Sequence, residues 1–506
     1  MKKVLALLLA VCLVFSFAAC GSKSSEGSDG PKILKLAESF AYASLDAHKD
    51  WNGWYTSIYG MTETLFKVGN DLSVQPLLAT KAEASEDGLT WTISLDPKAA
   101  FSTGKALTAD MAVRNLQRVA AENERFADMA EYVYAVVDDH TFTITTPSLY
   151  PTLVTDKLTN SALGIMDIDD SEDLDNAPIC TGPFVIKSFE PEGTVEVEKN
   201  ANYWNGDVKL DGVIFYYMND DESKLLAMQN GEIDGYSSVT AAAKEIYQAD
   251  SSKYVLTEIP GTRLQFYVLN KNTLSPNVRK AINLTVDNND MADYLKGTVS
   301  PAVGPFGPNA PYGQVTKPEL DPEKAKELIE EDGYTLNAEG FYEKDGEVLT
   351  VKISYYFARS LDTIALLMSG QLEAIGIKCV MDGVEDADAT YRATGDFDIA
   401  LYCMIADQAG DPYFAINALF RKNSDWARGG FPTEESEALI DQLQVETDIA
   451  KRAELANTIV QMTIDDDAFG YVGLFNKTTV MKPGVVNIGE NSPFDFYAVS
   501  ADTDMQ

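Results

Sequence analysis

The sequence offers few side chains whose type and spacing suit catalysis or metal binding. Histidine occurs only as His48 and His140, and the 5 cysteines include no CxxC pair. A structural zinc site and a disulfide framework are therefore not expected, because both need several suitably spaced ligands or thiols. The chain also lacks the GxSxG, HExxH and GxGxxG motifs. Nothing among these residue types supports an enzyme.

Two partial motifs lack the residues that their chemistry needs. Gly104-Lys105 resembles the end of a phosphate-binding loop, but the first glycine is missing and Ala106 stands where Ser or Thr is needed. The acidic run Asp167–Asp175 lacks the glycine and the closing glutamate of a calcium loop. We interpret this run as a solvated acidic loop.

Aromatic side chains are the more informative group. Trp51, Trp54, Tyr55 and Tyr59 fall within one short segment that contains Asn and Gly. Large rings on a loop suit the wall of a site that holds a small ligand. The same rings could equally fill a hydrophobic core, so both interpretations stay open for each of them.

Charge and length limit the classes of partner. The chain has 506 residues, with 78 acidic and 40 basic side chains and a net charge of −38. This balance argues against nucleic acid, whose phosphates need clustered positive charge, and against a polybasic membrane-binding surface. At roughly 100–200 residues per domain, the length allows two to four domains or lobes.

The N-terminus has the pattern of a secretory signal. Lys2 and Lys3 precede an apolar run, Val4–Ala19, that is too short for a membrane span. Phe17-Ala18-Ala19-Cys20 resembles a bacterial lipobox. We therefore expect residues 1–19 to be removed, Cys20 to carry the lipid, and residues 20–31 to act as a flexible tether on the outer face of the cell membrane. The alternative is an ordinary signal with a chance cysteine.

Hydrophobic periodicity predicts the elements that must position these residues. Predicted strands lie at 33–37, 90–96, 141–146, 264–269, 349–355, 377–381, 397–402, 470–474 and 478–481, with a hairpin at 183–188 and 194–198. Predicted helices lie at about 55–66, 108–121, 222–229, 276–285, 288–295, 322–331, 360–375, 433–445 and 448–464. Alternating strands and helices are typical of an α/β fold.

A series of short motifs runs in order through the chain from about residue 33 to residue 475. They are Leu45-Asp46-Ala47, Tyr59–Leu65, Gln75–Ala79, Asp87–Ile93, Phe101–Ala109, Thr181–Phe184, Asn200–Trp204, Gly231–Asp234, Val278–Ile282, Gly395–Asp398 and Asp411-Pro412. Together they resemble the signature segments of extracytoplasmic solute-binding proteins of the oligopeptide, dipeptide and nickel class, which is solute-binding protein family 5.

The resemblance implies a two-lobed periplasmic-binding-protein-like α/β fold of class II, with an extra subdomain at about 66–180. Lobe I would comprise residues 32–268 and 476–506, and lobe II residues 269–475. The lobes would close on one ligand, which the protein then delivers to an ABC permease powered by separate ATPases. No covalent chemistry and no cofactor are implied, and we expect a monomer.

In peptide-binding members, an aspartate shortly before the Asp-Pro element pairs with the α-amino group of the peptide. Asp407 matches that position, with one extra residue before Asp411-Pro412. The resemblance therefore implies that Asp407 anchors the ligand amine, because a charge-assisted bond is strong where water is excluded. The alternative is that Asp407 caps its own loop.

The nickel branch of the family binds metal chelates between aromatic walls, with an arginine for the chelator carboxylates. Arg125 lies in a stretch that resembles this branch, and Arg263 lies at the start of a strand. Either could bind a carboxylate of a chelator or of a peptide, although Arg125 could also be a surface residue. Residues 422–426, where a nickel-branch histidine would be expected, contain none. A chelator could supply its own nitrogens, so a nickel chelate stays the alternative transported ligand.

Tyr402, Cys403 and Met404 end an apolar strand. We interpret them as core residues rather than soft metal ligands, and keep Tyr402 and Met404 as candidate ligand contacts. Our first expectation is a short-peptide importer component. A secreted hydrolase with an acidic site would need a paired acid and base. A sensor that feeds a receptor would use the same fold.

Overall fold

The computed structural model describes residues 30–70, 72–407, 409–424, 426–427, 431–488 and 499–506. Ile33–Gln506 form one compact unit. The predicted signal peptide, Cys20 and nearly all of the predicted tether lie outside the described residues. In the described part of the chain, no helix combines the length and hydropathy that a membrane span requires.

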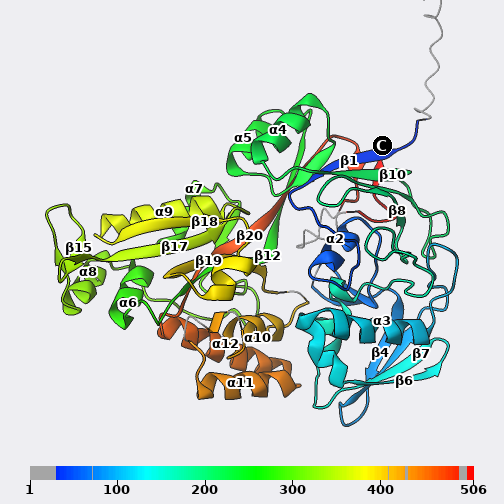
Figure 1. Ribbon diagram of the computed structural model, residues 1–506, viewed down its shortest axis with the longest axis horizontal. Helices are drawn as coiled ribbons and strands as arrows, with labels where there is room; N and C mark the ends of the chain where they lie inside the picture. The colour runs from blue at the N-terminus through cyan, green and yellow to red at the C-terminus, as the bar shows by residue number, and fades with distance from the viewer. Residues whose placement is uncertain (1–29, 71, 408, 425, 428–430, 489–498) are drawn as a thin grey trace, which may run out of the picture. The chain divides into compact units, whose positions relative to one another are not determined.

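Two long antiparallel strands run through the centre of the main sheet. They are β12 (Val255–Leu269) and β20 (Phe469–Met481) (Figure 1). Their register shifts between Ile259 and Arg263, and the intervening Gly261 lies against Phe475: a Cβ on Gly261 would lie 2.1 Å from the Phe475 carbonyl oxygen. The ladder can hold this close approach only because glycine has no side chain.

The remaining strands extend this ladder in two directions. On one side, here called the β18 side, lie β19 (Ile399–Ile405), β17 (Thr350–Tyr356) and β18 (Lys378–Val384). On the other, the β8 side, lie β11 (Gly235–Ser237), β1 (Ile33–Glu38), β10 (Gly212–Tyr217), β9 (Val195–Lys199) and β8 (Phe184–Phe189). β13 (Val299–Pro301) pairs with β20 away from this path.

A separate four-stranded sheet is formed by one continuous stretch of chain. Its order is β4 (Ala79–Ala84), β5 (Thr90–Leu95), β7 (Thr141–Thr145) and β6 (Val133–Asp138). Helix α3 (Ala109–Glu122) packs on it and begins at Thr108, whose hydroxyl accepts from the Met111 amide. The 3-10 helix η1 (Glu124–Glu131) and the short helices η2 (Val154–Leu158) and η3 (Ser161–Leu163) follow.

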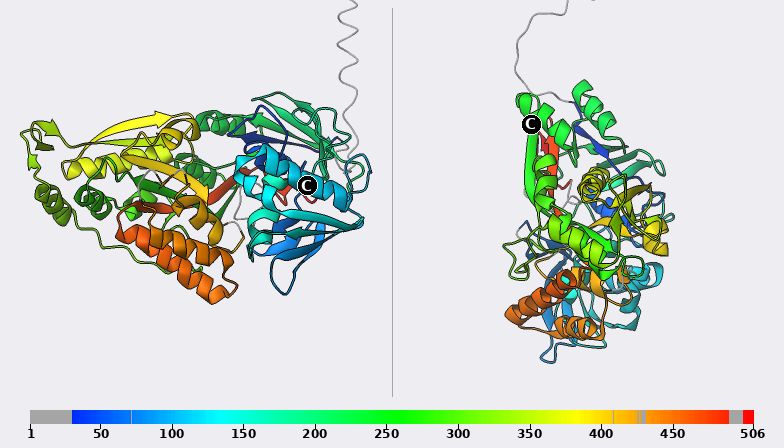
Figure 2. Two further views of the ribbon diagram at one scale, coloured as in Figure 1. Left: turned by 60° about the horizontal axis from the view of Figure 1, so that its bottom comes forward. Right: turned by 90° about the vertical axis from the view of Figure 1, so that its left-hand side faces the viewer.

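Helices cover the β18 side in two groups. The first group is α6 (Pro276–Thr285), α7 (Asn288–Tyr294), α8 (Pro322–Glu331) and α9 (Leu361–Ala374). The second is α10 (Tyr413–Phe420), α11 (Glu434–Val445) and α12 (Ile449–Asp465). Figure 1 and Figure 2 both show this second group beside α3 and the four-stranded sheet. One hydrophobic cluster runs across this contact, so the two regions share a core.

The shorter elements complete the chain. They are α2 (Asn52–Ile58), β2 (Phe66–Val68), β3 (Val74–Pro76), α4 (Asp221–Asn230), α5 (Ala241–Ala249), β14 (Thr335–Leu336), β15 (Tyr342–Lys344), β16 (Glu347–Val348), η4 (Asp388–Arg392), β21 (Val485–Val486) and β22 (Asp504–Met505).

Most predicted elements are present, with two corrections. The predicted strands 470–474 and 478–481 form one strand, β20, because Phe475 pairs with both Arg263 and Val299 and stays extended. The predicted helix at 55–66 is wrong beyond Ile58: the chain turns at Gly60, whose φ of 68° favours glycine.

Candidate ligand-binding site

A buried polar network fixes the aromatic segment that begins at Trp51. From α3, Arg118 donates to both carboxylate oxygens of Asp46, at 2.9 and 2.5 Å. It also lies 2.9 Å from His48 Nδ1, while His48 Nε2 lies 3.0 Å from the Gly164 carbonyl oxygen. Because Arg118 can only donate, Nδ1 accepts and Nε2 carries the proton. His48 is fully buried, and burial lowers its pKa to about 4, so it is a neutral structural residue here.

Trp51 and Arg125 stack at the start of this segment. Arg125 Cζ lies 3.6 Å from the centre of the Trp51 ring, and Trp51 is 41% exposed. Arg125 donates to the Asp50 carbonyl and, at 3.2 Å, to the Asn123 side-chain oxygen. Arg125 keeps an exposed face, yet desolvation by the protein atoms around its guanidinium lowers its pKa to about 10, and the charges of Asp50 and Asp388 oppose this shift. The guanidinium is therefore charged at neutral pH and can stack on a ring and attract a carboxylate.

Two more guanidinium groups lie over rings that come from distant segments. Arg263, on β12, places its Cζ 4.7 Å from the Trp54 ring centre. Arg359, just before α9, lies 5.2 Å from the Phe40 ring centre. Each of these contacts joins the β18 side or the central ladder to the N-terminal segment of the β8 side.

A fourth arginine lies on η4. Arg392 Cζ lies 4.7 Å from the Tyr402 ring centre and 5.2 Å from that of Trp426. Arg392 also pairs with Asp388, and the Tyr402 hydroxyl donates to the same carboxylate at 3.1 Å. The charge of Asp388 acts on Arg125 as well, which ties η4 electrostatically to the Trp51 segment.

We call these side chains the arginine–aromatic cluster. Their described contacts form three sets: Arg263 on Trp54, Arg359 on Phe40, and a larger set around Arg125, Asp388 and Arg392. The members of the cluster are Trp51, Trp54, Arg125, Arg263, Arg359, Asp388, Arg392, Tyr402 and Trp426. Aromatic faces beside guanidinium groups suit a small ligand that carries carboxylates.

Asp407 lies past the end of β19, close to this cluster. Its carboxylate accepts from the Tyr312 hydroxyl at 2.6 Å and from the Gly410 amide at 2.9 Å. Burial raises the pKa of Asp407, since only 6% of the residue is exposed. The neighbouring Ile405 and Ala409 pack in a small cluster with Trp54. The Asp407 carboxylate is therefore buried close to Trp54, a member of the arginine–aromatic cluster.

Not every predicted site residue joins the cluster. Tyr59 is a core residue, with its ring centre 4.6 Å from that of Phe215. Tyr55 is also buried in that core, and its hydroxyl accepts at 3.0 Å from the hydroxyl of Tyr42. Met404 packs, half-buried, against the large hydrophobic cluster. The cluster brings together Trp51, Trp54, Arg125, Arg263 and Tyr402 from the predicted set.

Four members of the cluster are not predicted as site residues by the sequence: Arg359, Asp388, Arg392 and Trp426. They come from three separate segments. Asp388 and Arg392 lie four residues apart on η4, but no local spacing links them to Arg359 or Trp426. Among the described residues, no group of three or more His, Cys, Asp and Glu side chains is arranged to hold a metal ion.

Comparison with known proteins reveals similarities that extend over most of the chain. Residues 73–426 match the model of bacterial extracellular solute-binding proteins, family 5, middle region. The nickel-binding protein NikA of Staphylococcus aureus is 24% identical over 515 residues, covering 100% of this chain and 99% of that protein.

Solved structures show the same fold. The structure of Staphylococcus aureus NikA in complex with Ni(L-His)2 has a TM-score of 0.84 at 22% identity, covering 94% of this chain and 100% of that one. The binding protein DppA of Helicobacter pylori, in complex with the peptide STSA, has a TM-score of 0.79 at 20% identity, covering 94% and 98%. The predicted two-lobed α/β fold is confirmed by these similarities.

Proposed function

Because the chain belongs to the bacterial extracellular solute-binding proteins of family 5, we propose that it is the ligand-capturing component of an ABC importer. The β8 side with the four-stranded sheet serves as lobe I, and the β18 side with α10–α12 serves as lobe II. Lobe closure around a ligand excludes water, and the closed form is the one presented to the permease. The protein binds and releases its ligand unchanged and performs no turnover.

The ligand that we propose is a short peptide, and the observation that carries this choice is Asp407. Its carboxyl group is buried, and the bonds described for it come from a hydroxyl and an amide rather than from a cation. A buried carboxylate is costly unless it is paired with a positive charge. The α-amino group of a peptide supplies that charge, and the arginines of the cluster attract its carboxylates.

Chemically matched peptides test this choice. Trialanine and N-acetyl-trialanine differ at the amine, and we expect acetylation to weaken binding at least tenfold in calorimetry. With Asp407→Asn, the two peptides should bind within about twofold of each other, since the amide has no charge to pair with the amine. Equal binding of both peptides to the unsubstituted protein would remove Asp407 from the site.

A nickel chelate is the second candidate, favoured by the similarity to nickel-binding relatives over the full chain. Four guanidinium groups beside aromatic rings, three of them tryptophans, also suit the carboxylates of a chelator. Such a ligand would bring its own metal-binding atoms. Nickel with L-histidine is the matching probe, and tight binding of it without any peptide binding would replace the first candidate.

We also propose that a lipid on Cys20 anchors the protein outside the cell. A thioether-linked lipid and a short polar tether would keep the lobes near the permease while leaving them free to close. Mass spectrometry of the membrane-extracted protein tests this: a diacylated N-terminal peptide starting at Cys20 is expected. A mature N-terminus at any other residue would contradict it.

A further inference from the structure

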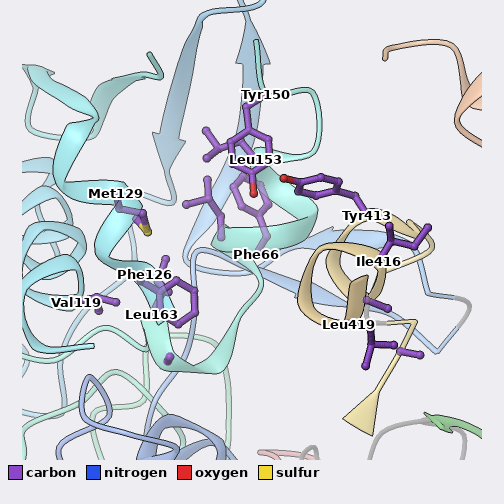
Figure 3. Close-up of a cluster of buried hydrophobic side chains, with 14 of the residues drawn as sticks. Phe66, Val119, Phe126, Met129, Tyr150, Leu153, Leu163, Tyr413, Ile416 and Leu419 are labelled. Atoms are coloured by element: carbon purple, nitrogen blue, oxygen red, sulfur yellow. The ribbon is translucent and has the colours of Figure 1, made fainter. Parts of the chain in front are cut away.

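The two lobes also meet at a second contact, on the side of Asp407 where helix α10 begins. Tyr150 and Leu153, just before η2, face Tyr413 and Ile416 on α10 (Figure 3). The rings of Tyr150 and Tyr413 meet edge to face, with centres 6.2 Å apart and planes at 77°. All four side chains are buried, so this contact excludes water between the two lobes.

A carboxyl group from each lobe lies at this contact. Asp156, on η2, is buried and accepts at 2.7 Å from the Thr152 hydroxyl. Asp411, just before α10, is held by Arg452, with N–O distances of 2.9 and 2.7 Å. Burial, and then the charge of Asp411, raise the pKa of Asp156 to about 7.

Other charged and titratable groups surround this pair. Lys157 opposes the shift, but its ammonium is paired with Asp128 on η1 at 2.8 Å. The Tyr150 hydroxyl also favours the ionised form of Asp156. Further groups that face this region in the described part of the chain are Tyr132, Tyr312, Tyr413, Asp407, Arg421 and Arg452. Burial and Asp411 outweigh the favourable groups, so the ionised form of Asp156 is disfavoured in the closed molecule.

We propose that the contact between residues 150–156 and α10 is a latch that holds the lobes closed, and that protonation of Asp156 tightens it. This inference rests on the proposed closure around a ligand. When the lobes separate, Asp156 gains water and loses the nearby charge of Asp411. It then ionises freely, whereas in the closed molecule its ionised form is buried and lies near a second carboxylate.

The direction of the pH effect follows from linkage. The pKa of Asp156 is about 7 in the closed molecule, against an ordinary value near 3.8 for an exposed carboxyl. Between these values the closed form binds more protons than the open form, so acidification favours closure. The stabilisation is complete below about pH 4, is lost as the pH rises through about 7, and is constant above that.

X-ray scattering of residues 21–506 without added ligand tests the latch directly. We expect the unsubstituted protein to have a larger radius of gyration at about pH 8 than at about pH 5. Asp156→Asn removes the charge and keeps the shape, so this variant should stay equally compact at both values. The same pH-dependent expansion in the variant and in the unsubstituted protein would overturn the proposal.

Asp467→Asn is a matched control. The Asp467 carboxyl also has a pKa raised by burial, but it accepts from Asn283 and takes no part in the contact with η2. This variant should expand with pH as the unsubstituted protein does. If Asp156→Asn does not give a native circular dichroism spectrum, Asp156→Ala replaces it with the same expected result.

Trialanine binding separates failure of the latch from failure of the proposed ligand. At about pH 8, Asp156→Asn should bind trialanine at least tenfold more tightly than the unsubstituted protein, and at about pH 4 the two should be equal. A constant ratio across this range contradicts the latch. If neither protein binds trialanine, the peptide proposal fails, and the scattering comparison still decides the latch.

Discussion

At the scale of single residues, burial and partners decide what a side chain does. His48 lies close to the aromatic segment in sequence, yet Arg118 and Gly164 occupy both of its ring nitrogens. Asp407 is almost as buried. The hydrogen-bond donors described for its carboxylate are a hydroxyl and a backbone amide, and neither carries a positive charge. The first residue holds the structure, and the second suits a charged ligand.

Replacement of Asp407 should therefore weaken ligand binding and leave the fold intact. We expect Asp407→Ala to reduce the affinity for trialanine at least tenfold, because the amine loses its charged partner. Calorimetry measures this, with Glu339→Ala, an exposed substitution in the turn between β14 and β15, as the control. Unchanged affinity in Asp407→Ala would contradict the anchor.

The lowered pKa of His48 predicts how the stability of the protein depends on pH. Its pKa falls from 6.5 in the unfolded chain to about 4 in the folded protein, because burial disfavours the charged ring. The unfolded state therefore binds more protons in this window, and stability is complete above about pH 6.5 and is lost as the pH falls towards 4. The melting temperature should drop over this range.

The His48→Asn variant separates this effect from general acid sensitivity. It should melt at a lower temperature near neutral pH, because it loses the bonds of the buried ring, and show a smaller drop on acidification. His140→Asn, on the turn between β6 and β7, should keep the drop of the unsubstituted protein. An equal drop in His48→Asn and His140→Asn would rule out His48 as its source.

At the scale of elements, the β12–β20 ladder is what joins the two sides of the sheet. One of its register shifts lies beside Gly261, whose missing side chain lets Phe475 approach. A second register shift lies between Gln265 and Phe266, so the ladder departs from regular pairing at two places, and the one beside Gly261 brings the two backbones into close contact. A substitution at Gly261 should therefore lower the stability of both lobes together.

Gly261→Ala should destabilise the protein by about 1–3 kcal/mol, because the new Cβ would collide with backbone that cannot move aside easily. Gly370→Ala is the matched control, since this glycine lies inside α9 with nothing near the added atom. There, a gain of about 0.5–1 kcal/mol is expected. Urea unfolding measures the free energy of unfolding of both variants. An unchanged value for Gly261→Ala would show that the ladder can relax around the added methyl group.

The helices show which elements can be predicted from the sequence pattern and which cannot. Helices such as α6 and α8 are predicted at their observed bounds, because proline begins them and their apolar spacing is helical. Helix α10 was missed, since the sequence Tyr413–Phe420 is apolar almost all round and has no helical stripe. Of the cluster, Trp51, Trp54, Arg125, Arg263 and Tyr402 were named from sequence. Arg359, Asp388, Arg392 and Trp426 are joined to them only by tertiary folding.

At the scale of the whole molecule, the fold is that of a two-lobed binding protein. The N-terminal segment of the β8 side supplies rings, and the ladder and β18 side supply guanidinium groups over them. Neither side alone assembles the arginine–aromatic cluster. A ligand that bridges the two sides would therefore stabilise the closed form.

The most direct test of this account is native mass spectrometry of residues 21–506 as purified from the producing cell. We predict non-covalent adducts with the masses of short peptides, which disappear when the protein is denatured. Asp407→Ala should carry fewer of them. A single adduct with the isotope pattern of nickel would contradict the peptide assignment and establish the chelate in its place.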